Sequence, residues 1–353
     1  MLARALDLRQ GEPRGGHGPA LVRRRRLAAR ELAFPRSGGL RFRIRRDRAR
    51  RRIVARSGRI RNGSLIPPMK VAIAQIHPRL GDLGRNVALH LDRVRAARAR
   101  GADLVVFSEL SLTGYLLLDL AQEVALDLAG AGPARRLAAA SRGIAILLGA
   151  VEATPDFRTH NTAALFEQGR LAFRHRKVYL PTYGMFDEGR YFAPGDRFRV
   201  HRSPRLGPLG VLICEDAWHL SSAYLLAQGG ADLVCVLSAG PVRGMRAGAE
   251  LASTAAWRDL CRVTAQFFTA YVVYCNRVGH EEGWTYSGGS FAVDPMGEVL
   301  AEASEGSEEL LMVEVRTDRL REARTAYPLL RDERPHLVGR ELERLLGRRA
   351  EEI

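Results

Sequence analysis

The sequence predicts an α/β domain with mixed β-sheets, on three observations. Short apolar runs typical of buried strands alternate along the chain with segments of helical periodicity. The alternation ends in hairpins, which add antiparallel strands to a sheet. The chain has 353 residues, of which 46% are hydrophobic, so it can bury a large core. Its length permits one large or two medium domains.

The expected strands are short apolar runs separated by turn formers. Gln168-Gly169 and Pro295-Met296-Gly297 each join two of these runs into a hairpin. We expect strands at 71–76, 104–107, 144–151, 162–166, 171–174, 210–213, 233–237, 271–274, 290–294, 299–303 and 310–315.

Helices are expected between these strands. The clearest follows Gly81, with Val87, Leu91 and Val94 on one face and arginines on the other. The polar, Arg/Glu-rich residues 317–353 are interpreted as a helical tail that packs on the body or on a second subunit. Further helices are expected at 134–140, 221–227, 248–268 and 338–346, and an irregular stretch rich in Pro, Gly and Tyr at 180–196.

Positive charge is concentrated at the N-terminal end of the chain. Residues 1–68 contain 20 Arg and 4 acidic residues, a balance of +16 that equals the net charge of the whole chain. Residues 69–353 are therefore neutral overall. A nucleic-acid-binding function is not expected for this neutral body, which we predict to be one domain at 69–316 followed by the tail.

Three interpretations of residues 1–68 remain open. A flexible Arg-rich arm can bind nucleic acid, and an Arg-rich, acid-poor segment is also typical of organelle-targeting peptides, although Ser is scarce here. The third interpretation is a disordered or non-native extension, with Met69 as the true start. We favour the third because an apolar strand begins directly at Met69.

Several classes of protein are excluded by composition. No apolar run approaches the roughly 18 residues that span a bilayer. Four cysteines without a CxxC pair indicate neither a disulfide framework nor a zinc site. We therefore expect a soluble, cytoplasmic protein with no metal and no cofactor.

Lys177 is one of two lysines among 55 basic Lys and Arg residues, and it lies in Arg-Lys-Val-Tyr-Leu-Pro at 176–181. A compact ammonium fits a small pocket and donates to an oxyanion, whereas a planar guanidinium suits bidentate partners. Glu109 follows the apolar run 104–108, and Cys214 follows the apolar run 210–213. A carboxylate, an ammonium and a thiol, two of them at the ends of buried strands, indicate a catalytic set and hence an enzyme.

Each of these residues also has a simpler interpretation. Most free cysteines are small buried hydrophobes, but Cys214 is followed at once by an acidic pair. Glu109 can be a solvated loop carboxylate, although it directly follows an apolar strand. His175 and His219 lie near the motifs, and neither is obviously placed as the base for a thiol.

Glu109, Lys177 and Cys214, in these contexts, resemble the Glu-Lys-Cys triad of the nitrilase superfamily of carbon–nitrogen hydrolases. The resemblance covers about 69–315 and implies a four-layer α-β-β-α sandwich, in which two mixed sheets pack face to face with helices outside. The surrounding motifs are most similar to the glutaminase domain of glutamine-dependent NAD synthetases. They are Glu109-Leu-Ser-Leu-Thr-Gly-Tyr-Leu-Leu-Leu-Asp-Leu120, Lys177-Val-Tyr-Leu-Pro-Thr-Tyr183, Phe186-Asp-Glu-Gly-Arg-Tyr-Phe-Ala-Pro-Gly195 and Gly210-Val-Leu-Ile-Cys-Glu-Asp-Ala-Trp218.

The resemblance implies a thiol-dependent amidohydrolase that converts a carboxamide to an acid and ammonia. Cys214 would be the nucleophile that forms a thioester, and Glu109 the base and then the acid. Lys177, with the backbone N–H after Cys214, would hold the oxyanion. Glu188 matches the second glutamate of the superfamily, which positions substrate or water, although a Glu in a Gly-rich loop is usually just solvated.

The resemblance to the glutamine-binding pocket of these glutaminase domains is less complete than the resemblance to the triad. An Arg suits an α-carboxylate and a Glu suits an α-amino group. The relatives have a serine before a proline after the next strand, whereas this chain has Ser238-Ala-Gly240-Pro241, so a hydroxyl contact is missing unless Ser238 supplies it. Glutamine is therefore one of several possible substrates. The positions that match the glutamine-holding residues are Tyr115, Tyr183, Phe186, Glu215 and Arg246.

The leading prediction is a stand-alone, glutaminase-like enzyme that can supply ammonia to a separate synthetase. The alternatives are an N-carbamoyl amine or ω-amide hydrolase, and a non-catalytic glutaminase-like subunit. No synthetase domain is expected, because Ser287-Gly288-Gly289-Ser290 lacks the Asp that follows the phosphate loop of ATP pyrophosphatases. We expect a homodimer or larger assembly. Trp284 and Tyr286 are expected in core packing rather than in the pocket.

Overall fold

The computed structural model describes residues 68–243 and 251–351, with side chains described as far as residue 348. All of these belong to one compact unit, Gly63–Ile353. The predictions made for residues 1–67 and for Arg246 lie outside the described residues.

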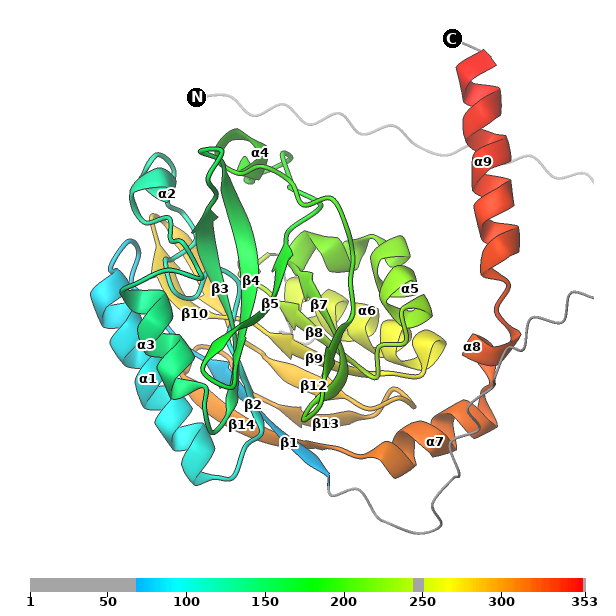
Figure 1. The fold of residues 1–353 in the computed structure, drawn as a ribbon, viewed down its shortest axis with the longest axis horizontal. Coiled ribbons are helices and arrows are strands. Elements are labelled where there is room, and N and C mark those ends of the chain that lie inside the picture. The colour runs from blue at the N-terminus through cyan, green and yellow to red at the C-terminus, as the bar shows by residue number, and fades with distance from the viewer. Residues whose placement is uncertain (1–67, 244–250, 352–353) are drawn as a thin grey trace, which may run out of the picture. The chain divides into compact units, whose positions relative to one another are not determined.

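Two six-stranded mixed sheets form the centre of the unit (Figure 1). The first has the order β14 (Glu309–Val315), β1 (Met69–Gln75), β2 (Leu104–Val106), β3 (Ala145–Ala153), β4 (Thr159–Glu167) and β5 (Arg170–Arg176). The second has the order β13 (Val299–Glu302), β12 (Phe291–Val293), β9 (Tyr271–Cys275), β8 (Leu233–Leu237), β7 (Gly207–Ile213) and β6 (His201–Ser203). The strands β10 (Val278–Glu281) and β11 (Trp284–Ser287) form a separate hairpin.

Each sheet has a parallel centre and antiparallel edges. The strands β1, β2 and β3 are parallel, and β14, β4 and β5 are antiparallel to their neighbours. Similarly, β7, β8 and β9 are parallel, and β6, β12 and β13 are antiparallel to theirs. The strands β2 and β7 lie at the parallel centres of different sheets, so the loops after them can bring functional side chains together where the two sheets pack face to face.

Of the described helices, two cover the outer face of each sheet, and the others lie in loops or in the C-terminal tail. Their bounds are α1 (Leu83–Ala99), α2 (Leu120–Glu123), α3 (Pro133–Ala140), α4 (Glu188–Tyr191), a 3₁₀ helix (Cys214–Trp218), α5 (Leu220–Gln228), α6 (Ala252–Phe268), α7 (Thr317–Ala326), α8 (Leu329–Asp332) and α9 (Pro335–Glu351).

The burial pattern shows how the layers stack. Alternate strand residues such as Ile73 and Val106 face Val211 and Val273 of the other sheet in one core. The intervening strand residues pack outward, against α1 and α3 on the first sheet and against α5 and α6 on the second. The result is the four-layer α-β-β-α sandwich, with two sheets face to face and helices outside (Figure 1).

The structure extends the predicted element map in a few places. The stretch expected to be irregular at 180–196 contains the short helix α4. The long helix expected from 248 begins at Ala252, and residues 248–250 are outside the described part. The strand β6 and the hairpin β10–β11 had no counterpart in the predicted elements, whereas α7 lies within the helical tail predicted for residues 317–353.

Candidate active site

Cys214 lies on a strained turn between β7 and the 3₁₀ helix. Its backbone φ is +44°, in the left-handed region that non-glycine residues rarely adopt. Such a strand-to-helix turn lifts a side chain from the end of the sheet and points backbone N–H groups at it. The thiol is half-buried, and the Ser238 hydroxyl donates to its Sγ atom at 3.6 Å.

Glu109 is 1% exposed and lies just beyond β2, in a loop that packs closely on β3. A Cβ atom at Gly149 would come within 2.2 Å of the Leu110 backbone nitrogen, so only glycine allows this approach. The Glu109 carboxylate is fully engaged. Its Oε2 accepts from the Ala239 backbone N–H at 2.9 Å, and its Oε1 accepts from Asn161 Nδ2 at 2.8 Å.

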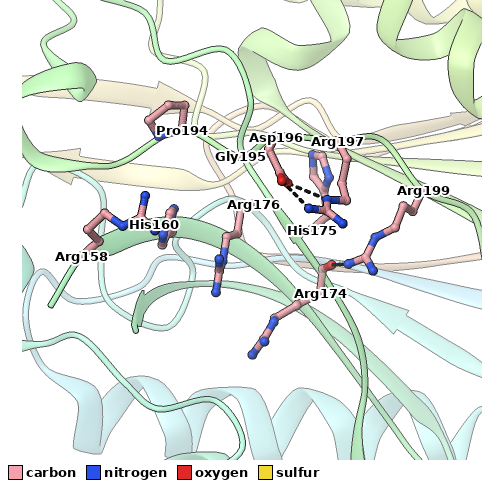
Figure 2. A pocket seen from close by; sticks show the side chains of 10 residues that line it. All are labelled: Arg158, His160, Arg174, His175, Arg176, Pro194, Gly195, Asp196, Arg197 and Arg199. Carbon is pink, nitrogen blue, oxygen red and sulfur yellow. Dashed lines mark hydrogen bonds and ion pairs between the residues drawn. The ribbon is translucent and has the colours of Figure 1, made fainter. Parts of the chain in front are cut away.

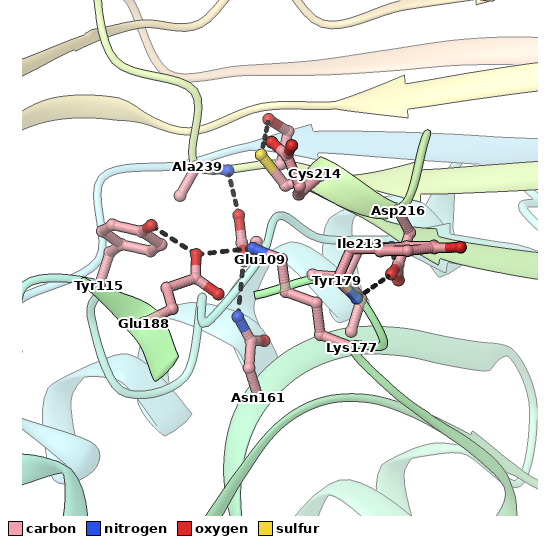
Figure 3. Close-up of polar contacts among 12 residues, drawn as sticks. Glu109, Tyr115, Asn161, Lys177, Tyr179, Glu188, Ile213, Cys214, Asp216 and Ala239 are labelled. Carbon is pink, nitrogen blue, oxygen red and sulfur yellow. Dashed lines mark hydrogen bonds and ion pairs between the residues drawn. The ribbon is translucent and has the colours of Figure 1, made fainter. Parts of the chain in front are cut away.

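Lys177 follows β5 directly, is 1% exposed, and is shared by two carboxylates. Its Nζ donates to Glu109 Oε1 at 2.7 Å and to Glu188 Oε1 at 2.6 Å (Figure 3). Glu188, the first residue of α4, also accepts from the Tyr115 hydroxyl at 2.6 Å. An ammonium held between two carboxylates in a buried site keeps a fixed position and a full charge.

The charges in this cluster shift one another's pKa values. Burial opposes the charged form of Lys177, but the carboxylates of Glu109 and Glu188 outweigh it and raise its pKa well above the usual value. Burial raises the pKa of Glu188 to about 7, with Lys177 opposing and Glu109 adding to the rise. Burial and the Glu109 carboxylate raise the pKa of the Cys214 thiol well above its usual value. The thiol is therefore protonated at rest and needs a base to react.

Asp216, fully buried, fastens the Lys177 segment to the Cys214 turn. Its Oδ1 accepts from the Val178 and Tyr179 backbone N–H groups, both at 3.0 Å. Its Oδ2 accepts from the Ile213 N–H at 3.1 Å and contacts His175 Nε2 at 2.8 Å. This carboxylate therefore links a loop of the first sheet to a loop of the second.

A second buried carboxylate holds the segment that carries Tyr115. Glu281 on β10 accepts from the Tyr115 and Leu116 backbone N–H groups at 3.0 and 3.1 Å. It is paired with Arg277, which is fully buried and lies over the Tyr286 ring. The Tyr115 hydroxyl is thereby directed toward Glu188.

A cavity of about 330 Å³ opens above Cys214. Glu215 borders it and accepts from the Tyr183 hydroxyl at 2.9 Å, while Arg243 lies 4.6 Å from the Phe186 ring centre. Among the described residues, the cavity therefore presents the Glu215 carboxylate and the Arg243 guanidinium near the thiol. Its lining residues are Tyr183, Phe186, Cys214, Glu215, Trp218, Gly240, Pro241, Arg243, Ala252, Ser253, Ala256 and Trp257.

The structure places the predicted site residues in two groups. Glu109, Lys177, Glu188 and Tyr115 form the buried cluster, and Tyr183, Phe186 and Glu215 line the cavity with Cys214. Tyr115 does not line that cavity, and Arg246 lies outside the described residues.

The other residues considered from sequence have clear positions. His175 is buried on Asp216, and His219 stacks on Tyr179 with ring centres 3.5 Å apart. Tyr286 packs in the core as expected, whereas Trp284 is only partly buried and packs on Phe186. Asn161 was missed from sequence, and Asp216 was quoted in the motif at 210–218 without a role, because a polar residue inside or beside a strand gives no local sign of the partner it meets.

Two further observations concern the residues that the structure describes. In that part of the chain, no group of three His, Cys, Asp or Glu side chains could hold a metal ion. Among the same residues, every helix is too short or too polar to cross a membrane.

Comparison with known proteins identifies the family. A family model for carbon-nitrogen hydrolases matches residues 70–325. This chain belongs to the carbon-nitrogen hydrolase family. It is thereby a member of the nitrilase superfamily, in agreement with the triad motifs and with the fold.

This carbon-nitrogen hydrolase is similar to two kinds of enzyme. A glutamine-dependent NAD(+) synthetase of Thermotoga maritima is 33% identical over 254 residues, which are 71% of this chain and 42% of the relative. The chain thus spans less than half the length of that synthetase. An (R)-stereoselective amidase of a Pseudomonas species is 34% identical over 291 residues, which are 80% of this chain and 97% of the amidase.

A solved amidase has a similar structure. A mutant of the amidase from Nesterenkonia sp. AN1, with the acetamide moiety of fluoroacetamide added at its active site cysteine, superimposes with a TM-score of 0.65 and 26% identity. The match covers 79% of this hydrolase and 99% of that chain.

Proposed function

We propose that this carbon-nitrogen hydrolase is a thiol-dependent amidohydrolase that cleaves the C–N bond of a carboxamide through a Cys214 thioester. One observation carries the proposal. A thiol on a strained turn lies beside a buried cluster in which Lys177 is shared by Glu109 and Glu188. The cluster supplies a base for the thiol and a fixed positive charge for an oxyanion.

In the first half of the reaction, the Cys214 sulfur attacks the carbonyl carbon while its proton passes to Glu109. Proton transfer must accompany attack, because the raised pKa of Cys214 keeps little thiolate present. Lys177 and the backbone N–H of Glu215 receive the oxyanion, a contribution of about 3–4 kcal/mol per donor. The C–N bond then breaks, Glu109 returns the proton to nitrogen, and ammonia leaves a thioester.

In the second half, Glu109 takes a proton from water as the water oxygen attacks the thioester carbonyl. The C–S bond breaks, the sulfur recovers the proton from Glu109, and the acid is released. Glu188 borders the same ammonium and would position the water or the leaving nitrogen. This role suits a carboxyl group whose pKa is about 7.

An amino-acid amide such as glutamine is the substrate class we propose. Glu215 can accept from an α-amino group, and Arg243 brings a guanidinium to the same cavity for an α-carboxylate. Arg246, predicted from sequence for that second role, is a further candidate. Ser238 supplies a hydroxyl to the nucleophile itself, so its contact is with the reacting sulfur and not with the cavity lining.

The similarity to an amidase along nearly its whole length supports a second candidate, hydrolysis of another amide or of an N-carbamoyl amine. Ammonia release should be measured with glutamine, asparagine, ω-amides and N-carbamoyl compounds, with Cys214→Ala as the control. Glutamine turnover that the variant lacks supports the first candidate. Turnover of a carbamoyl compound or ω-amide without glutamine turnover would replace it with the second.

Labelling tests the remaining alternative, a non-catalytic glutaminase-like subunit. Fluoroacetamide should modify Cys214 in the folded protein and leave the buried Cys235 unmodified, as mass spectrometry of peptides would show. An unlabelled Cys214 together with no ammonia release would favour the non-catalytic subunit.

We also propose that the enzyme forms a homodimer or larger assembly and can feed ammonia to a separate synthetase. Exposed apolar side chains on the 3₁₀ helix, α5 and α6 support the first part, including Trp218, Leu225 and Phe267 at 48%, 50% and 62% exposure. The similarity to NAD(+) synthetases supports the second part. Sedimentation equilibrium of the full chain tests the assembly, and a monomer at micromolar concentration would contradict it.

A further inference from the structure

A groove separate from the Cys214 cavity is lined by five arginines. It has a volume of about 250 Å³ and runs between the end of β5, the start of β4 and the segment after α4 (Figure 2). Of the described residues, none lines both this groove and the cavity above Cys214. The groove residues are Arg158, His160, Arg174, His175, Arg176, Pro194, Gly195, Asp196, Arg197 and Arg199.

The guanidinium groups in this arginine groove outnumber the carboxylates that contact them. Arg174 and Arg176 share one carboxylate, that of Glu152, at 3.0 and 2.8 Å. Arg158 pairs with Asp156 and Arg197 with Asp196. Within the described residues, Arg199 contacts a backbone carbonyl and the Phe173 ring but no carboxylate. The groove therefore has an excess of positive charge that its own side chains do not neutralise.

His160 adds an unsatisfied polar atom to the groove. The side chain is 2% exposed, its Nδ1 donates to the Ala193 carbonyl at 2.7 Å, and its Nε2 is buried without a partner. Burial and the neighbouring Arg176 lower the pKa of this imidazole, which favours a neutral ring whose Nε2 is an acceptor. A ligand for this groove should therefore carry negative charge and also one proton to share.

We propose that the arginine groove binds an oligophosphate, either free or attached to a small organic group. Phosphate oxygens accept bidentate hydrogen bonds from guanidinium groups. Arg199 can donate them because it contacts no carboxylate among the described residues, and the other four arginines add positive charge that three carboxylates do not fully neutralise. A phosphate near its second ionisation also carries an O–H that can donate to His160 Nε2, whereas sulfate and carboxylates are fully ionised and can only accept. The unpartnered Nε2 thus distinguishes phosphate from the other oxyanions.

Residues 194–199 form one wall of the arginine groove and pack closely against the end of β5. Gly195 donates its N–H to the Lys177 carbonyl at 2.7 Å, and a Cβ atom there would lie 2.2 Å from the Arg176 carbonyl oxygen. The wall is thereby held against β5 by backbone contact, while Arg197 and Arg199 remain exposed at its rim. Figure 2 shows Arg158 and His160 on one side of Arg176, with Arg197 and Arg199 on the other.

The test is calorimetric titration of the full chain with inorganic pyrophosphate at physiological salt. Two double variants with equal loss of charge are compared: Arg197→Ser with Arg199→Ser in the groove, and Arg135→Ser with Arg136→Ser on the exposed face of α3. We expect saturable binding with one site, weakened at least tenfold by the groove variant and unchanged by the α3 variant. Equal weakening by both variants, or full binding by the groove variant, would overturn the proposal.

His160→Asn tests the proton-sharing atom. The Asn amide can retain the donor to the Ala193 carbonyl while removing Nε2, so the fold is preserved. We expect wild-type protein to bind pyrophosphate at least tenfold more tightly than sulfate, and the variant to lose that preference. Equal affinity of the wild type for both anions would overturn the assignment to phosphate.

ADP identifies the source of the oligophosphate. Binding of ADP that the groove variant weakens supports an attached group, and binding of pyrophosphate alone supports the free anion. Binding of neither probe would overturn the proposal.

Discussion

The two sheets contribute unlike parts to the proposed active site. The first supplies charge, because Glu109 and Lys177 lie at its strand ends, are each 1% exposed, and are paired with one another. The second supplies the nucleophile, a half-buried thiol on a turn with φ +44°. The charges are thus fixed before a substrate arrives, whereas the thiol remains accessible. The difference shows that electrostatic preorganisation and access to substrate are assigned to different layers of the fold.

Hydrogen bonds across the two sheets join these parts. The Ala239 N–H, beyond β8, donates to Glu109, and the Glu109 N–H donates to the Ser238 carbonyl at 3.4 Å. Asp216 makes the corresponding link between the Cys214 turn and the segment after Lys177. Catalysis should therefore depend on both parts and on the links between them.

The largest effect is expected from removing the Cys214 thiol, which is the contribution of the second sheet to the proposed active site. Cys214→Ala should lower kcat by about 10⁴-fold or more, because no other group can form the thioester. The measurement is ammonia release under saturating substrate. Cys235→Ala, in the core of the second sheet, is the matched control and should change stability by about 1–2 kcal/mol with little change in kcat. Equal loss of activity in both variants would contradict the assignment.

Removing the charge supplied by the first sheet should have the next largest effect. Lys177→Met keeps the length of the side chain but leaves two buried carboxylates without their cation, so kcat should fall by about 10²–10³-fold. The free energy of unfolding should fall by about 3–5 kcal/mol, as urea denaturation would show. Lys70→Met is the control at the other lysine and should leave both quantities nearly unchanged. Substantial retained turnover in Lys177→Met would exclude it as the oxyanion donor.

Weakening the link between the sheets should have a smaller effect on turnover. Asp216→Asn replaces an acceptor by an NH₂ group that faces either the Ile213 N–H or the paired backbone N–H groups of Val178 and Tyr179. We expect kcat to fall by about 10–100-fold and stability by about 1–3 kcal/mol. Asp103→Asn, a more exposed carboxylate that contacts Arg205, is the control. An unchanged kcat would show that the two parts are aligned without this link.

The smallest predicted effect concerns Glu188 and pH. Its pKa rises from 4.5 to about 7 on folding, so between these values the folded state binds more protons than the unfolded state. The contribution of Glu188 to stability is complete below pH 4.5 and is lost as the pH rises through 7, on the order of 1–3 kcal/mol. Relative to the wild type, Glu188→Gln should therefore gain stability between pH 4.5 and 8.

Urea denaturation at both pH values measures this change. The exposed Glu123→Gln is the control and should show no such dependence. A pH-independent difference between Glu188→Gln and the wild type would show that Glu188 keeps an ordinary pKa.

Most of the fold could be predicted because its strands are continuous apolar runs. The strands at Leu104 and Leu233 are buried on both faces, so their sequences are uniform and easily recognised. The hairpin β10–β11 has a polar, glycine-containing sequence and could not be recognised in this way. The helix α7 buries only Leu320 and Ala323, so its sequence has little apolar periodicity, and it was predicted only as part of the helical tail at 317–353.

The candidate site was predictable where residues follow strand ends within a familiar motif, as Glu109, Lys177 and Cys214 do. The links were not. Asp216 and His175 are separated by 41 residues, and nothing near either of them in the sequence indicates the other. The arginine groove was also hidden, because its members come from three segments and are few in each.

The loop that carries Glu109 packs closely on Gly149, so a residue without any functional group determines the position of the Glu109 carboxylate. A methyl group there would leave every reactive atom chemically intact, yet it would displace the loop that carries Glu109. Surveys that rank residues by their chemistry would overlook this site. Activity should therefore be sensitive to substitution of Gly149, whose side chain is a single hydrogen atom, because the loop that carries the Glu109 carboxylate packs directly on it.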